Sequence, residues 1–255
     1  MSTAPRRDAE PVDKYVDEWL QFYDIYCEDE ILRLAQHYPN EEQALSVDQS
    51  DLFQFDTDLW ERYFESPALA RAEAERALAE YNIPVAVDLE GASVRLGNLE
   101  AMERLGPQYV YSVGQTPPDD TRNLRIIKGQ VTRTGPTKTY QREITFKCER
   151  CGTPTVLPQP DPTSLNEPHE CMGCERQGPF RRVSTSDEEI WYRQVRIQQP
   201  AEEATGGAQP ETMDVTLLGE DIVHSVEPGE RLFIAAELVP VYDDDEPTYV
   251  HRAHA

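Results

Sequence analysis

Two short cysteine motifs decide the fold: residues 148–151 read Cys148-Glu-Arg-Cys151 and residues 171–174 read Cys171-Met-Gly-Cys174. Nineteen residues, 152 to 170, separate them. Two thiolates three residues apart can bind one tetrahedral ion, and this separation is typical of a four-cysteine zinc ribbon. The four cysteines could instead form two disulfides, whereas a redox C-x-x-C would sit in a βαβ pattern that is absent here. We expect one structural zinc per chain, because four thiolates leave no position for water.

The residues just before the first motif carry an unusual charge. The chain has 255 residues, with 24 Lys and Arg against 48 Asp and Glu, and a formal net charge of −24. Between residues 121 and 148 seven residues are basic and one, Glu143, is acidic. A positive stretch in so acidic a chain indicates an anionic partner, with nucleic-acid phosphate as the leading candidate. The basic residues are Arg122, Arg125, Lys128, Arg133, Lys138, Arg142 and Lys147.

Acidic residues dominate the rest of the sequence, and only four of the basic residues are lysines. This composition is typical of a protein that stays soluble in molar salt, as in a halophilic archaeon, because the Debye length falls to about 3 Å at 1 M. The alternative is an acidic, partly disordered eukaryotic segment, against which the aromatic content of 9 % and the regular patterning argue.

The expected location is a reducing, high-salt cytoplasm in association with the nucleoid. The fifth cysteine, Cys27, lies in an apolar-periodic stretch, and an odd thiol beside a metal motif fits a reducing compartment. The N-terminal residues 1–14 have no apolar core of a secretory signal. No apolar run reaches the roughly 18 residues of a membrane span, so we expect no membrane partner.

The first 82 or so residues predict a small helical bundle behind a disordered start of about twelve residues. Apolar residues recur at helical spacing between residues 12 and 37, and residues 44–55 suggest a short extended segment. Asp56 or Thr57 should cap a helix that ends at Phe64. That helix should direct Trp60 and Tyr63 inward, and Pro67 suits the first turn of the next one, to about residue 81.

After residue 82 the pattern changes to short strands between turns. The predicted fold class is α+β: an N-terminal helical bundle followed by an oligonucleotide-binding (OB) β-barrel with an inserted zinc ribbon. The expected domains are 1–92 for the bundle, 93–146 and 181–255 for the two parts of the barrel, and 147–180 for the ribbon, with a hairpin near 240–252. The predicted strands are 94–99, 109–113, 124–131, 137–146, 189–198, 212–218 and 231–241.

Strand alternation predicts which side chains share a face. Cations beside an exposed tyrosine are what a groove for single-stranded nucleic acid uses, the cations for phosphate and the ring for stacking. The alternative is that Tyr140 lies in the core and the arginines pair with acids. In residues 137–147 the predicted face holds Lys138, Tyr140, Arg142, Ile144 and Phe146; in residues 189–198, Tyr192, Gln194, Arg196 and Gln198 should lie opposite Trp191, Val195 and Ile197.

Five segments resemble the N-terminal region of archaeal minichromosome maintenance (MCM) replicative helicases. Residues 45–56 (LSVDQSDLFQFD) are similar to the signature of the family's helical domain, and residues 94–99 (VRLGNL) to the start of its barrel. Residues 128–133 (KGQVTR) resemble its first barrel strand. The last two segments are quite specific: QVRIQQP at 194–200 with GGAQP at 206–210 resembles "KIRIQEP…GGEQPR", and DIVHSVEPGER at 221–231 resembles "DLVDSVRPGDR".

The resemblance implies a helical bundle, a zinc ribbon that helps to join two rings, and a barrel that grips single-stranded DNA. It implies DNA and further copies of the chain, in a hexameric or double-hexameric ring, as partners. Lys138 and Arg196 match DNA-binding positions of the family, and Arg133 lies at a basic position nearby. The predicted strand face adds Arg142, and the predicted hairpin adds His251 and Arg252. The candidate nucleic-acid-binding residues are therefore Arg133, Lys138, Arg142, Arg196, His251 and Arg252.

The sequence departs from the family at several positions. The family's arginine after "QP" is Glu211 here, and its "QE" is Gln198-Gln199. The hairpin tip, usually basic, reads Asp243-Asp-Asp-Glu246. These departures favour an alternative in which the chain is a protein–protein assembly module with little DNA affinity of its own.

No catalytic residues are expected in this chain, and no small-molecule substrate. A helicase motor needs the phosphate loop Gly-x-x-x-x-Gly-Lys-[Ser/Thr], but none of the four lysines follows glycine. The chain is therefore expected to be a fragment whose full-length parent is an ATP-dependent DNA helicase. A zinc enzyme would need an open ligand position that four cysteines do not leave.

Overall fold

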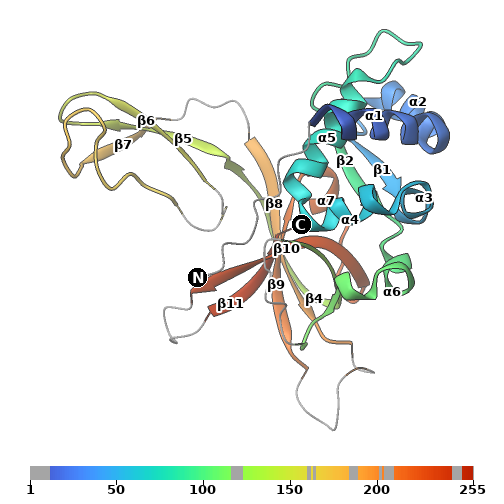
Figure 1. The fold of residues 1–255 in the computed structure, drawn as a ribbon. Coiled ribbons are helices and arrows are strands. Elements are labelled where there is room, and N and C mark those ends of the chain that lie inside the picture. The colour runs from blue at the N-terminus through green and yellow to red at the C-terminus, as the bar shows by residue number, and fades with distance from the viewer. Residues whose placement is uncertain are drawn as a thin grey trace, which may run out of the picture. The chain divides into compact units, whose positions relative to one another are not determined.

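The fold is described from a computed structural model (Figure 1). It describes residues 12–115, 123–159, 162, 165–183, 189–200, 203, 210–242 and 249–254, without the side chains of residues 12, 13, 221 and 238–254. The expected disordered segment lies almost entirely outside these residues. The chain divides into two compact units. The first comprises Met1–Gln130, Ile197–Met213 and Arg231–Ala255, and the second comprises Val131–Arg196 and Asp214–Glu230.

The N-terminal part of the first unit is a helical region around an aromatic core, which confirms the predicted bundle. Trp19 packs edge-on against Phe22 and Tyr63, with ring centroids 5.7 and 6.1 Å apart. Aromatic pairs in this geometry add to the stabilisation from burial. The helical elements are α1 (Val12–Phe22), the π-helix η1 (Tyr23–Cys27), α2 (Glu28–His37), α3 (Gln49–Phe55), α4 (Thr57–Glu65) and α5 (Pro67–Glu80).

Two aspartate caps set where α3 and α4 begin. Asp56 accepts hydrogen bonds from the backbone N–H groups of Asp58 and Leu59, at 2.8 and 2.9 Å, as predicted. The extended segment expected over residues 44–55 is correct only for β1 (Ala44–Asp48). From residue 49 the chain is helical, because Asp48 caps α3 by accepting from the N–H of Ser50 at 2.7 Å.

The strand expected at the start of the barrel belongs to the helical region instead. It forms β2 (Ser93–Gly97), which pairs in parallel with β1 in a separate two-stranded sheet, Leu45 opposite Val94. The apolar side chains of both strands are buried in the same core as the helices, which explains the pairing. Three short helices lead on to the barrel: η2 (Leu99–Ala101), α6 (Met102–Leu105) and η3 (Pro107–Tyr109).

The remaining strands form an OB-like curled sheet, which confirms the predicted class. The strand order is β10-β11-β9-β8-β4-β3, and β10 also pairs with β4, so that five strands form a closed circuit (Figure 1). The short helix α7 (Glu220–Val223) separates β9 from β10. The strands are β3 (Val110–Ser112), β4 (Leu124–Gln141), β8 (Glu189–Gln198), β9 (Thr212–Leu218), β10 (Arg231–Tyr242) and β11 (Tyr249–His254).

The cysteine motifs lie in a separate three-stranded antiparallel sheet, the cysteine sheet, in the order β6-β5-β7. Its strands are β5 (Glu143–Cys148), β6 (Pro154–Pro158) and β7 (Phe180–Val183). The single face predicted for residues 138–146 is wrong. Lys138 and Arg142 are exposed, whereas Ile144 and Phe146 are buried, because the strand breaks at Arg142 and β5 builds the core of a different sheet.

Candidate metal centre and nucleic-acid interface

Each cysteine motif is a backbone knuckle with the same hydrogen bonds. In the first, the N–H of Gly152 donates to the carbonyl of Cys148 at 2.8 Å, and the N–H of Cys148 donates to Thr153 at 3.0 Å. In the second, Glu175 donates to Cys171 at 2.8 Å, and Cys171 donates to Arg176 at 3.0 Å. These bonds turn each motif so that both of its thiols face the same point.

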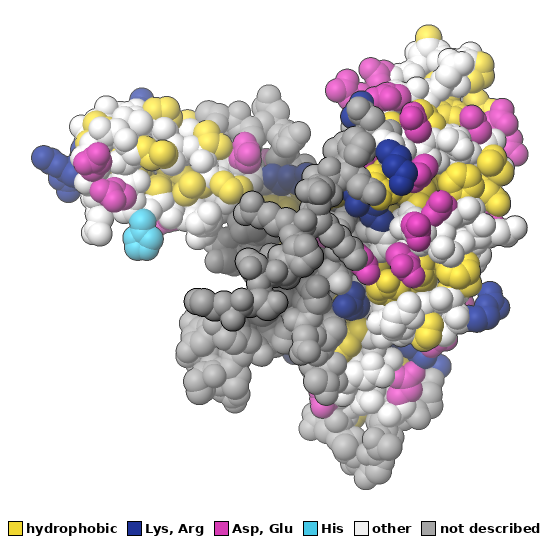
Figure 2. Space-filling model, viewed as in Figure 1, with side chains coloured by type: hydrophobic (Ala, Val, Ile, Leu, Met, Phe, Trp, Pro, Cys, Tyr) yellow, Lys and Arg dark blue, Asp and Glu magenta, His cyan; other side chains and the backbone are white. Residues whose placement is uncertain are grey.

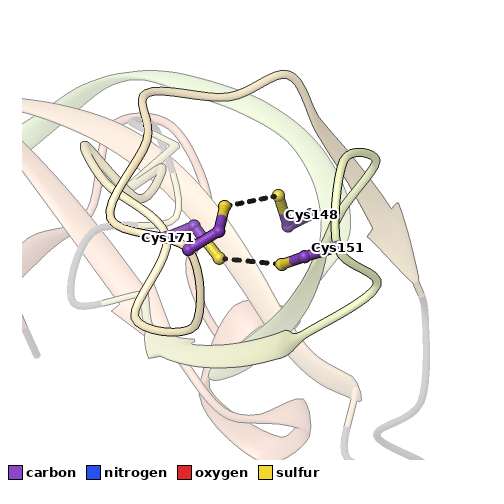
Figure 3. A group of neighbouring side chains, drawn as sticks. Cys148, Cys151 and Cys171 are labelled. Carbon is purple, nitrogen blue, oxygen red and sulfur yellow. Dashed lines mark hydrogen bonds between the residues drawn. The ribbon is translucent and has the colours of Figure 1, made fainter.

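The four thiols converge as the spacing predicts (Figure 3). The Sγ atoms of Cys148 and Cys174 lie 3.9 Å apart, those of Cys151 and Cys171 lie 3.5 Å apart, and all four lie within 4.8 Å of one another. A tetrahedral zinc with Zn–S bonds of about 2.3 Å places its sulfurs about 3.8 Å apart. A disulfide needs about 2.05 Å, and these cysteines are free. The cluster is compatible with one zinc site, and its thiols are not joined as disulfides.

The surroundings of the thiols favour the metal-binding form at Cys151. The hydroxyl of Thr153 lies 3.2 Å from the Cys151 Sγ. Hydrogen bonds from this hydroxyl and from the Thr153 backbone lower the pKa of the Cys151 thiol to about 6, which favours the thiolate. The N–H of Gly173 donates to the Sγ of Cys171 at 3.4 Å. The donor set and its hydrogen bonds therefore fit a structural tetrathiolate site.

Three of the predicted DNA contacts are exposed basic side chains of the second unit. Arg133 and Lys138 lie on β4, and Arg142 follows its end. Within the described part of the chain, no ion pair involves any of the three. Arg133 and Lys138 are five residues apart, so regular alternation directs them to opposite faces of β4. The strand itself therefore does not gather these cations on one surface.

Arg196 is engaged by an acid on the neighbouring strand. Its Nε and Nη2 donate to the two carboxylate oxygens of Asp214 on β9, at 2.7 and 3.0 Å. These hydrogen bonds, together with the charge of Asp214, raise the pKa of the Arg196 guanidinium further. The alternative that arginines pair with acids therefore holds at this position.

The predicted faces of β8 are wrong at its aromatic end. Tyr192 is 8 % exposed and packs edge-on against Tyr140 at 5.7 Å, whereas Trp191 is 39 % exposed beside His224. Tyr192 and Val195 are both buried although they are three residues apart, so the alternation shifts between them. Tyr140 and Tyr192 thus contribute to packing, and Trp191 is the exposed ring.

Arg193, which the sequence analysis did not single out, lies at this shift. Its Nε donates to the carbonyl of Gly135 at 2.9 Å, and its Nη1 donates to those of Val223 and Val226 at 3.1 and 3.2 Å. One guanidinium therefore joins β4 to the segment around α7 through three carbonyls. Strand alternation could not predict that Arg193 forms these hydrogen bonds, because the acceptors are backbone carbonyls of residues that are distant in sequence.

Lys128 forms a second charged cluster that sequence reasoning missed. Its Nζ lies 2.6 Å from the carboxylate of Glu103 and 2.8 Å from that of Glu203, and the hydrogen bonds that the ammonium donates to these two carboxylates raise the pKa of Lys128. The backbone carbonyl of Glu203 also accepts from the side chain of Gln199 at 3.1 Å. The positive charge of Lys128 is thus offset within the first unit.

The remaining two candidates lie on the predicted hairpin. Strands β10 and β11 pair antiparallel, with Tyr242 opposite Tyr249. His251 and Arg252 are in β11, opposite Pro240 and Val239, but their side chains lie outside the described residues. The acidic tip, residues 243–246, also lies outside them.

The fold and the cysteine site together define a class: an OB-fold protein with a helical N-terminal region and a four-cysteine ribbon inserted in the barrel. Residues 115–241, about half of the chain, match the family model of the MCM OB domain. The chain belongs to the MCM family and corresponds to its N-terminal domain.

Individual relatives agree with this assignment. The chain is 30 % identical over 152 residues to the DNA replication licensing factor mcm-6 of Caenorhabditis briggsae, a match covering 59 % of this chain and 18 % of that protein. It is 22 % identical over 263 residues to the licensing factor mcm7-A of Xenopus laevis, a match covering 86 % of this chain and 36 % of that protein. The chain thus spans much less than half the length of these relatives.

A solved structure shares the fold. The crystal structure of the N-terminal domain of an archaeal MCM superposes with a TM-score of 0.65 at 20 % identity, covering 96 % of this chain and 97 % of that one. Among the described residues no helix is long and apolar enough to cross a membrane.

Proposed function

We propose that this chain is the DNA-binding and ring-assembling collar of an MCM-type replicative helicase. The observation that supports it most is the closed OB-like barrel with a four-cysteine ribbon, in a chain that matches the MCM OB domain. OB barrels bind single-stranded nucleic acid in a basic groove with aromatic side chains. The ATPase that unwinds DNA would be carried by another part of a longer protein.

The ribbon would hold one structural zinc on Cys148, Cys151, Cys171 and Cys174. Zinc supplies a cross-link among four thiolates and stabilises the fold around it. With all four positions filled by sulfur, the ion would have no catalytic role. In the proposed ring, hexameric or double-hexameric, this sheet would contribute contacts between copies of the chain.

The proposed DNA contacts are the exposed cations of the second unit. Lys138, Arg133 and Arg142 are exposed and have no carboxylate partner in the described structure, so their charges are available to phosphate. Arg196 would share its guanidinium between Asp214 and phosphate, or exchange one for the other. His251 and Arg252 are proposed as further contacts from β11.

Fluorescence anisotropy of a labelled oligo-dT, measured from low to molar potassium chloride, tests this function. We expect the double variant Lys138→Glu/Arg196→Gln to bind at least about tenfold more weakly, with a shallower salt dependence. Gln at position 196 avoids placing a second carboxylate beside Asp214. Arg33→Gln, which removes an exposed, ion-paired cation of the helical region, serves as the control. Unchanged affinity in the folded double variant would contradict the proposed site.

A second candidate function is a protein–protein assembly module with little DNA affinity. The observation that favours it is that Arg196 and Lys128 already have carboxylate partners. Glu211, where the family has arginine, adds another negative charge. Sedimentation that shows rings of this chain, together with no anisotropy change at any salt concentration, would favour this function.

We also propose a high-salt cytoplasm of a haloarchaeal-like organism as the working environment. The support is the excess of acids, 48 against 24 basic residues, and acidic side chains spread over the visible face of the helical region (Figure 2). Screening by salt weakens their mutual repulsion. The melting temperature should therefore rise between 0.1 and 2 M potassium chloride, and a falling value would contradict this adaptation.

A further inference from the structure

Lys147 and Arg181 lie side by side on the cysteine sheet. They are opposite each other on the antiparallel strands β5 and β7. Opposed residues in such a pair have Cβ atoms about 4.5–5.5 Å apart, and like charges there are destabilising. The sheet therefore retains a pair of cations that repel each other.

Neither cation has an acidic partner within the described residues, in contrast to several basic side chains of the first unit. No ion pair joins Lys147 or Arg181 to a carboxylate within 4.0 Å there. Lys14 and Arg76 pair with acids four residues away, and Arg33 pairs with Glu42. Like Arg133, Lys138 and Arg142, these two cations are not ion-paired in the described structure, but Lys147 and Arg181 are also direct cross-strand neighbours, in a chain where acids outnumber bases two to one.

A hollow of about 470 Å³ lies between these side chains and the first knuckle. It is lined by Lys147, Cys148, Glu149, Gly152 and Arg181. The lysine side chain extends along the knuckle, with its Cε 3.7 Å from the position that a Cβ on Gly152 would occupy. Both cations therefore border a space that can admit an anionic group.

We infer that Lys147 and Arg181 form a binding site for a backbone phosphate of nucleic acid, beside the first knuckle and additional to the barrel contacts. The inference rests on the proposed DNA-binding function. An ammonium and a guanidinium supply charge-assisted donors to phosphate oxygens. Glu149 borders the same hollow, so its carboxylate disfavours a doubly charged anion more than a phosphodiester, which carries one charge.

The metal centre offers another use for the two cations. Four thiolates around a zinc ion carry a net charge of −2, which nearby cations would offset. The hydrogen bonds described at the Sγ atoms, however, involve Gly173, Thr153 and the cysteines themselves, not Lys147 or Arg181. The cations border the hollow rather than donate to sulfur, and this favours an external anion.

The test is the double variant Lys147→Gln/Arg181→Gln, with Arg182→Gln as the matched control. Arg182 is also exposed and lies one residue along β7, opposite Phe146, so alternation directs it to the other face. Anisotropy with oligo-dT across potassium chloride is measured beside zinc content and sedimentation. We expect about tenfold weaker binding and a log–log salt slope shallower by about 0.7, since the pair binds one phosphate and each phosphate contact contributes about 0.7. Glu149→Gln should bind more tightly, and zinc should stay at one per chain.

Each contrary result has a distinct meaning. If the Lys147/Arg181 variant binds like the parent while the Lys138/Arg196 variant does not, the site is refuted and the DNA-binding function stands. If the parent chain binds no DNA at any salt concentration, both are refuted. Loss of zinc with unchanged DNA binding would assign the pair to the metal centre. Loss of self-association with unchanged DNA binding would assign it to an acidic surface of a second copy.

Discussion

The helical region and the cysteine sheet are stabilised by different means. Among the described residues, six of the seven largest fully buried side chains lie in the helical region, and the seventh, Phe146, comes from the cysteine sheet. The sheet instead leaves Val156 and Met172 exposed, the latter to 84 %. Apolar burial can therefore sustain the first region, whereas we expect the second to depend on its four thiols. The six helical-region residues are Trp19, Trp60, Tyr23, Tyr63, Phe22 and Phe64.

Removing the metal should give the largest difference between the two regions. We expect Cys171→Ser, or treatment with a strong chelator, to abolish amide protection across residues 143–183, because structural zinc contributes an apparent 10–16 kcal/mol, roughly, in zinc-finger peptides. Hydrogen exchange measures this loss. The fluorescence of Trp19 and Trp60, in a Trp191→Phe background, should keep its denaturation midpoint.

Cys27→Ser is the control for this experiment, because Cys27 is a buried thiol of the helical region outside the cluster. It should leave the protection of residues 143–183 unchanged. Full amide protection of the cysteine sheet without metal would show that its small apolar core is sufficient to keep it folded. The two regions would then not differ in how they are stabilised.

A buried ion pair in the helical region should give the next largest effect. Arg62 binds both oxygens of Glu73 at 2.7 and 2.9 Å, and Glu73 is only 2 % exposed. Arg62→Met would leave that carboxylate buried without its partner, which costs about 3–5 kcal/mol. Urea denaturation followed by tryptophan fluorescence should show this loss.

Arg76→Gln is the matched control, since Arg76 and Glu80 form an exposed pair on α5. It should cost less than about 1 kcal/mol. If both substitutions cost the same, the buried pair adds nothing beyond a surface pair, and the helical region relies on apolar contacts alone.

A smaller effect of opposite sign is expected at Gln49. Its side chain is fully buried, and within the described structure neither its Oε1 nor its Nε2 has a hydrogen-bond partner. An unsatisfied buried polar group costs about 1–3 kcal/mol. Gln49→Met keeps a similar volume and should raise the denaturation midpoint of the helical region. A decrease would indicate that ordered water satisfies the amide.

Local signals explain which parts of the molecule the sequence predicted. The convergence of the four thiols follows from the spacing within each knuckle, and Asp56 caps its helix through bonds to residues two and three positions on. Strands β8 and β9 have the predicted bounds. Each of these features depends on residues close together in the chain, so the local sequence pattern is sufficient to predict it.

The errors concern interactions between distant residues. β2 was expected in the barrel but pairs with β1, almost fifty residues earlier. The faces of β8 fail where Tyr192 packs against Tyr140. The bidentate bond of Arg196 to Asp214 depends on which strands are neighbours. Periodicity does not specify these pairings, because many arrangements of strands satisfy the same alternation.

The smallest expected effect concerns the two knuckles, which place different residue types at the same backbone position. The residue after the second cysteine has a left-handed backbone in both, with φ +79° at Gly152 and +52° at Glu175. Glycine adopts this conformation without a steric cost, whereas glutamate is strained there by about 1 kcal/mol. Glu175→Gly should therefore stabilise the zinc-bound sheet slightly, by up to about 1 kcal/mol, and Gly152→Ala should destabilise it by a similar amount. The rate of zinc transfer to a chelating dye measures this change in stability: we expect slower transfer from Glu175→Gly and faster transfer from Gly152→Ala. Equal rates would mean that the residue type at these positions does not affect the stability of the zinc-bound sheet.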